Sequence, residues 1–136
     1  MSFEKRSSLM SKIKAKNTTP ERTIIDQLTR LGLEYQAHDR TLPGKPDVVF
    51  YSTKVAIFID GDFWHGWHFS QWKTKLTAWW QKKIGDNIKR DQRNMRKLRG
   101  MGWKIIRIWE HQIENDPKKA ISTILSTIEQ RFACQN

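Results

Sequence analysis

The sequence predicts a single-domain α/β fold in which helices flank a mixed β-sheet. Three observations predict it: helical apolar spacing near both ends, a β-branched hairpin between them, and a further apolar strand after a long helical segment. The resulting order, α-β-β-β-α-β-α, is typical of a sheet layered with helices. The chain has 136 residues, enough to bury one core, and its only cysteine, Cys134, cannot form an internal disulfide.

The first predicted element is a helix over TTPERTIIDQLTRLG. Thr19 is expected to cap it, Pro20 to occupy the first helical position and Gly32 to end it. Its apolar face consists of Ile24, Ile25, Leu28 and Leu31. A short strand is expected to follow at 33–36.

Two β-branched and aromatic runs, DVVFY and KVAIFID, come next and predict an antiparallel hairpin after the LPGKP turn. Asp47 opens the first run and Asp60 closes the second, so the hairpin should bring the two carboxylates to one edge. Hard oxygen ligands of this kind suit Mg²⁺. The alternative is that both are solubilising residues at strand ends.

The second half of the chain is expected to begin with a helix over 73–99, stopped by Gly100 and Gly102. Its apolar positions are Leu76, Trp80, Ile84, Ile88, Met95 and Leu98. WKIIRIW then predicts a buried strand. DPKKAISTILSTIEQRF predicts a closing helix with Asp116 as its cap and Pro117 next. Its inward residues should be Ile121, Ile124, Leu125 and Ile128.

The formal net charge is +11, and the positive charge is concentrated in two segments. Residues 1–16 hold five basic side chains against one acidic, and residues 73–104 hold eleven against two. Basic segments around a body that carries carboxylates favour a protein that binds nucleic acid phosphates. A solvated basic helix face remains the alternative.

His65 and Asp91 form a second candidate pair. A histidine after DGDFW could be a packed polar ring, but Asp91 is a carboxylate inside the strongly basic KRDQRN segment. A carboxylate that binds one imidazole nitrogen leaves the other free to act as a base toward water. Glu21, by contrast, is an ordinary acidic residue for the first turn of a helix.

Aromatic residues crowd the segment between these carboxylates and the basic helix. The chain has seven tryptophans, and the crowded segment holds Phe63, Trp64, Trp67, Phe69, Trp72, Trp79 and Trp80. Some must pack in the core, while flat rings beside a basic surface suit base stacking or wedging into a duplex. We expect Trp67, Phe69 and Trp72 to be structural and Phe63, Trp64 and Trp80 to face DNA.

The chain contains no apolar run long enough for a membrane span, and its first residues lack the apolar centre of a signal peptide. We therefore expect a cytoplasmic protein with no membrane partner.

Several sequence motifs resemble those of the very short patch repair (Vsr) mismatch endonucleases, and the resemblance extends over nearly the whole chain. They are RSSLMSKIKAKNTTPE, LPGKPDVVF, VAIFIDGDFWHG, KIGDNIKRDQRNMRKLRGMGW and IIRIWE. The resemblance implies a restriction-endonuclease-like fold of the PD-(D/E)xK superfamily. It also implies a bacterial-type, nucleoid-associated enzyme that nicks double-stranded DNA beside a T:G mismatch with Mg²⁺. We divide the chain into a basic DNA-binding arm, 1–18, and an endonuclease domain, 19–136.

The resemblance also implies residue roles. Asp47, the Ile59 carbonyl and Asp60 are expected near the metal, Glu21 to orient a water on it, and His65 to act as base with Asp91 as its partner. The expected DNA-binding residues are Phe63, Trp64, Trp80, Met10, Lys12, Lys14, Lys89, Arg90 and Arg93.

The sequence departs from the family pattern where known members bind a structural zinc. Asp62, Trp67, Phe69 and His111 stand at these positions, and we expect no structural zinc, because tetrahedral zinc needs a full set of soft or borderline ligands. Asp60 stands where some members have histidine. The alternatives to a mismatch nuclease are a restriction or defence nuclease of the same fold, acting on unmismatched or modified DNA, and a non-catalytic DNA-binding module. We expect a monomer, with repair accessory proteins as possible partners.

Overall fold

The computed structural model describes residues 19–63 and 65–135. The predicted arm 1–18, with Met10, Lys12 and Lys14, and the predicted wedge residue Trp64 lie outside the described residues.

A four-stranded mixed sheet forms the centre of the fold, in the order β1-β2-β3-β4. Its strands are β1 (Gln36–Ala37), β2 (Val48–Phe50), β3 (Val55–Asp60) and β4 (Lys104–Trp109). β1 pairs with β2, and β2 with β3, in the antiparallel sense, whereas β3 and β4 are parallel. The prediction of an α/β fold with a mixed sheet and flanking helices is confirmed.

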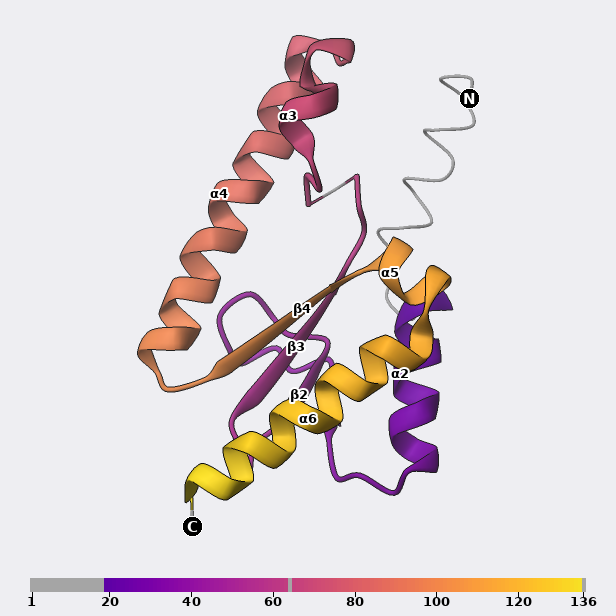
Figure 1. The fold of residues 1–136 in the computed structure, drawn as a ribbon. Coiled ribbons are helices and arrows are strands. Elements are labelled where there is room, and N and C mark those ends of the chain that lie inside the picture. The colour runs from indigo at the N-terminus through magenta and orange to yellow at the C-terminus, as the bar shows by residue number, and fades with distance from the viewer. Residues whose placement is uncertain (1–18, 64, 136) are drawn as a thin grey trace.

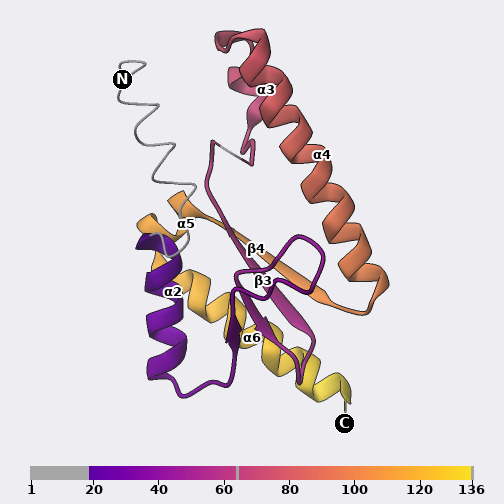
Figure 2. The same ribbon diagram turned by 180° about the vertical axis from the view of Figure 1, so that it is seen from behind.

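Helices cover both faces of this sheet (Figures 1 and 2). One face packs on α2 (Thr19–Arg30), α5 (Glu110–Asn115) and α6 (Pro117–Gln135), and the other on α4 (Ala78–Gly100). Side chains alternate between the faces along each strand. Val48, Ile57 and Ile106 contribute to the core beneath α2, α5 and α6, while Val49 and Phe58 pack with Met95 and Leu98 of α4.

The structure corrects several predicted boundaries. The first helix begins at Thr19 itself, and Leu31, predicted on its apolar face, is 50% exposed, because the helix ends at Arg30. The first strand lies at Gln36–Ala37 and not at 33–36, since its position is set by pairing with Val48 and Val49.

The predicted helix over 73–99 is divided. It consists of a 3₁₀ turn, η1 (Lys73–Lys75), and α4, which begins only at Ala78. Thr77 caps α4, because its side chain accepts a hydrogen bond from the Trp80 N–H at 3.4 Å. Leu76 therefore lies in the connection and not on the helix face. Two short helices, α3 (Phe69–Trp72) and α5, were not predicted.

The closing helix agrees with its prediction. It starts at Pro117, and the Asp116 carboxylate accepts a hydrogen bond from the Lys119 N–H at 3.1 Å. None of the helices in the described part of the chain is both long and apolar enough to cross a membrane.

Candidate active site

Asp47 is fixed at the end of the hairpin where β2 begins. Its backbone N–H donates to the Ile57 carbonyl at 2.9 Å, and its Oδ2 accepts from the Ile59 N–H at 2.7 Å. The side chain is buried. Strand pairing thus fixes both the backbone and the carboxylate of Asp47, and it holds the carboxylate against the backbone of Ile59, the predicted carbonyl ligand.

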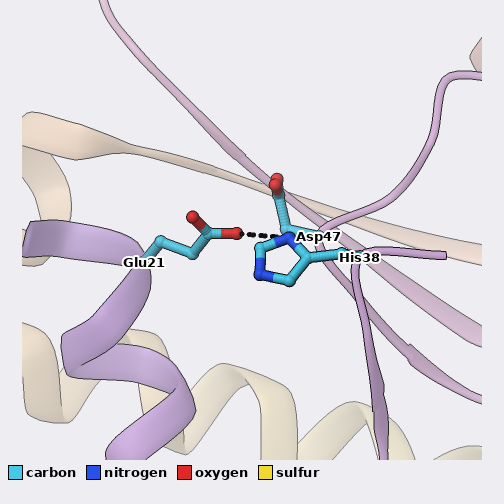
Figure 3. Close-up of side chains that lie close together, drawn as sticks. All are labelled: Glu21, His38 and Asp47. Carbon is cyan, nitrogen blue, oxygen red and sulfur yellow. Dashed lines mark ion pairs between the residues drawn. The ribbon is translucent and has the colours of Figure 1, made fainter. Parts of the chain in front are cut away.

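Two further side chains lie close to the Asp47 carboxylate. They are Glu21, which comes from α2, and His38, which directly follows β1 (Figure 3). One potential ligand atom from each of the three side chains lies within 4.8 Å of the other two. His38 Nδ1 is 3.2 Å from Glu21 Oε1. His38 reaches this place through a left-handed backbone conformation, φ 56°, while its N–H donates to the Asp47 carbonyl at 2.9 Å.

The donor set of this group fits a divalent cation. Glu21 is 3% exposed and Asp47 7%, and two carboxylates so far from water favour a nearby positive charge. Carboxylate oxygens are the ligands that Mg²⁺ prefers, while an imidazole is also accepted by first-row transition metals. Within residues 19–63 and 65–135, this is the one cluster of at least three acidic, histidine or cysteine side chains arranged for metal binding.

His65 and Asp91 form the contact that the sequence predicted. His65 Nδ1 lies 2.6 Å from Asp91 Oδ2, which joins the loop after β3 to the middle of α4. The neighbouring Gly66 allows this close approach: it has φ +72°, and a Cβ added to it would lie 2.4 Å from Ile88 Cδ1. A larger residue at 66 would push the His65 loop away from α4.

Asp60 faces the His65 side of the site. Its Oδ1 lies 3.5 Å from His65 Nε2, and its Oδ2 accepts a hydrogen bond from Arg107 Nε at 2.7 Å. Arg107 Nη2 also donates to Asp91 Oδ2 at 3.1 Å. Asp60 is therefore not part of the Glu21, His38 and Asp47 group, and its role as a metal ligand stays a prediction.

The environment shifts the protonation of this second group. Burial raises the pKa of Asp60, and the charges of His65 and Arg107 oppose that shift. The Asp47 charge also raises the pKa of Asp60, which reflects the convergence of the two carboxylates at one end of the hairpin. Burial acts to lower the pKa of His65, but the Asp91 hydrogen bond and the Asp60 charge outweigh it and leave that pKa raised.

Aromatic side chains between Phe63 and Trp80 form a connected cluster. Phe63 stacks on Trp72 with ring centroids 5.3 Å apart and contacts Trp80 edge-on at 5.5 Å. Phe69 also packs edge-on against Trp72. The predicted structural ring Trp72 and the predicted DNA-facing rings Phe63 and Trp80 therefore belong to one cluster. Trp79, which is 63% exposed, extends it toward solvent.

The four positions at which the resemblance places zinc ligands have a different chemistry here. His111 Nδ1 lies 2.8 Å from Asp62 Oδ1, and the Trp67 ring packs on His111 with centroids 4.2 Å apart. Phe69 supplies no ligand atom. One carboxylate and one imidazole that already bind each other do not make a tetrahedral zinc site.

The predicted phosphate-binding residues of α4 are exposed. Lys89, Arg90 and Arg93 lie on the helix that carries Asp91, whose own side chain turns inward to His65. Their exposure leaves phosphate binding by α4 as a prediction.

Comparison with known proteins identifies relatives that match most of this chain. The model of the Vsr DNA mismatch endonuclease family matches residues 1–71. The type II nicking enzyme V.HpaIIP of Haemophilus parainfluenzae is 35% identical over 131 residues, which cover 94% of this chain and 93% of the relative. The DNA mismatch endonuclease Vsr of Escherichia coli (strain K12) is 32% identical over 127 residues, covering 92% and 81%. The type II nicking enzyme V.NmeDIP of Neisseria meningitidis serogroup C is 36% identical over 113 residues, covering 81% and 76%.

The fold, the acidic site and the family match define the class: this is a DNA endonuclease. The chain belongs to the Vsr DNA mismatch endonuclease family. The predicted family and the predicted nicking endonuclease activity are thereby confirmed, and the PD-(D/E)xK assignment stays a prediction.

Two residues of the site were missed by the sequence analysis. His38 was missed because the first strand was predicted too early, so its pairing next to Asp47 could not be derived. Arg107 could have been found from the sequence, because a charge inside the apolar KIIRIW strand requires a partner when it is buried.

Proposed function

We propose that the protein is a Mg²⁺-dependent endonuclease that makes a strand-specific nick beside a T:G mismatch in double-stranded DNA, acting as a monomer in very short patch repair. The observation that carries this proposal is that one end of the β2–β3 hairpin holds both Asp47, grouped with Glu21 and His38, and Asp60, which lies 3.5 Å from the His65 ring that contacts Asp91.

In this proposal, Asp47 and the Ile59 carbonyl hold the metal, and Glu21, with His38 beside it, orients a water on the metal. Bound there, Mg²⁺ would neutralise charge that develops on the scissile phosphate. The carboxylate of Asp47 is held in place by the Ile59 N–H, so it needs little rearrangement on binding.

His65 handles the proton. Its Nδ1–H donates to Asp91, which fixes the tautomer and leaves Nε2 as the nitrogen that accepts a proton from the attacking water. The exposed cations of α4 bind the phosphate backbone, and the rings of Phe63, Trp64 and Trp80 stack or wedge where pairing is already weak.

A second candidate is a restriction or defence nuclease of the same fold that acts on unmismatched or modified DNA. The observation that favours it is that two of the three relatives described above are named type II nicking enzymes.

The test is to incubate the protein with Mg²⁺ and end-labelled matched, T:G-mismatched or methylated duplexes, and to separate nicks from double-strand breaks on denaturing and native gels. Nicking confined to one strand of the T:G duplex is expected. Equal cleavage of the matched or methylated duplex would favour the second candidate.

The site assignment has its own test. Asp47→Asn should abolish nicking while DNA binding stays near normal or becomes tighter, because only the metal-binding charge is removed. Asp26→Asn, at an exposed position of α2, is the matched control and should nick normally. Nicking that survives in Asp47→Asn would contradict the assignment.

A further inference from the structure

We infer that Arg107 is a positioning residue for this reaction, because its guanidinium ties Asp60 to Asp91 and so fixes the two carboxylates between which the His65 ring lies. The inference rests on the proposed function and adds to it a residue, Arg107, to which the family resemblance assigned no role.

Arg107 and His65 contact the same two carboxylates. Arg107 donates from Nε to Asp60 Oδ2 at 2.7 Å and from Nη2 to Asp91 Oδ2 at 3.1 Å. His65 places Nδ1 2.6 Å from Asp91 Oδ2 and Nε2 3.5 Å from Asp60 Oδ1. The four side chains form a closed ring in which cationic or imidazole groups alternate with carboxylates.

The members of this ring come from separate parts of the fold. Asp60 ends β3, His65 lies in the following loop, Asp91 is in α4 and Arg107 is in β4. β3 and β4 are joined by six consecutive parallel pairs, from Val55 with Lys104 to Asp60 with Trp109. Arg107 therefore stands on the most extensively paired part of the sheet and connects the mid-point of α4 to it.

The orientation of the guanidinium is itself restrained. Its Cζ lies 4.3 Å from the centroid of the Trp109 ring, a distance typical of a cation–π contact. With the guanidinium placed against Trp109, two separate nitrogens point at two different carboxylates. A lysine would keep the positive charge, but its single ammonium lacks this fixed fork.

The carboxylates need such a partner. The Asp60 side chain is 7% exposed and the Asp91 side chain 12%, and two like charges so placed repel each other when no cation lies between them. Without the fork, we expect Asp91 to lose its fixed position and the His65 ring to lose its direction. Displacement of a catalytic group by about 1 Å can lower a rate about 100-fold.

The main test variant is Arg107→Lys, measured for kcat, DNA affinity and its salt dependence, and for the NMR signal of the His65 Nδ1 proton. We expect kcat to fall by about 10- to 100-fold, with DNA affinity and salt dependence unchanged, and the His65 signal to shift or broaden.

Arg131→Met is the matched control. Arg131 also donates from Nε and Nη2 to two acceptors, the carbonyls of Thr53 at 3.1 Å and Gly102 at 2.7 Å. This variant should lower the melting temperature but leave kcat and the His65 signal as in the wild type at a temperature well below melting.

Two outcomes would overturn the inference. One is Arg107→Lys with wild-type kcat and an unchanged His65 signal. The other is wild-type kcat with a salt dependence that is shallower by about 0.9 in log Kd against log salt, which would make Arg107 a phosphate-binding residue. If the wild-type protein nicks no duplex, the proposed function fails, and the NMR comparison still decides whether Arg107 holds His65.

Discussion

The close approach between Gly66 and α4 predicts a large and separable effect of one methyl group. In Gly66→Ala, the backbone of the new alanine must keep φ +72°, a left-handed conformation that costs a non-glycine residue about 1–2 kcal/mol. Its Cβ would also lie 2.4 Å from Ile88 Cδ1 and 2.7 Å from Ile88 Cγ1, an overpacking that costs about 1–3 kcal/mol. The free energy of unfolding should therefore fall by about 2–5 kcal/mol.

Gly32 provides the matched control, because it has the same φ of +72° and no atom within 4 Å of an added Cβ. Gly32→Ala should show only the conformational part of the destabilisation, about 1–2 kcal/mol, in denaturant unfolding. Gly66→Ala should also nick more slowly at a permissive temperature, since His65 is the adjacent residue, and Ile88→Ala in the same chain should restore part of the rate. Equal destabilisation of the two alanine variants would refute the role of the close approach to Ile88.

Three further predictions concern DNA binding, acid stability and metal content. Replacing Lys89, Arg90 and Arg93 by alanine should reduce the slope of log affinity against log salt by about 0.9 for each phosphate that the helix no longer neutralises, measured by fluorescence anisotropy at several salt concentrations; an unchanged slope would mean that α4 is only a solvated face. The Tyr51 hydroxyl donates to Asp39 and lowers the pKa of that carboxyl, so the stability contributed by Asp39 is present above its ordinary pKa and disappears as pH falls through the lowered value. Tyr51→Phe should therefore unfold at a higher pH than the wild type in an acid titration followed by circular dichroism, and an unchanged or lower midpoint would contradict this. Chelation should stop nicking without appreciably lowering the melting temperature, and atomic absorption should find no stoichiometric zinc; about one zinc per chain would disprove the replacement of that site by Asp62, Trp67 and His111.

Local sequence patterns were sufficient to predict the elements whose apolar pattern extends over several residues. The apolar spacing of α2 and α6 signals helices because burial on one face repeats along them, while the continuous β-branched runs of β2 and β3 signal strands that are buried on both faces. The interaction of His65 with Asp91 was predictable on chemical grounds, since an acidic residue in a basic helix suggests a specific partner.

Features set by pairing over long distances could not be derived in this way. β1 has two residues, too few for a period, and only its register with Val48 and Val49 places His38 beside Glu21. The break before α4 was missed because Leu76 and Trp80 fit a helical spacing, while the capping of the helix by Thr77 is a local competition that spacing does not report.

The two carboxylates at the end of the hairpin, Asp47 and Asp60, have different partners. This difference explains how one hairpin end could serve both metal and proton chemistry. Asp47 is held by the Ile59 N–H and accompanied by Glu21 and His38, whereas the next residue along β3, Asp60, is compensated by Arg107. If Asp60 had no cation of its own, its charge would add to that of Asp47 and draw a metal or the His65 imidazolium toward itself. In the proposed mechanism, Arg107 neutralises this charge, so that a metal would remain with Asp47 while the His65 ring keeps its orientation toward Asp91. On this reading, the fork of Arg107 separates the metal group around Asp47, at the start of β2, from the proton-handling group around Asp60, at the end of β3.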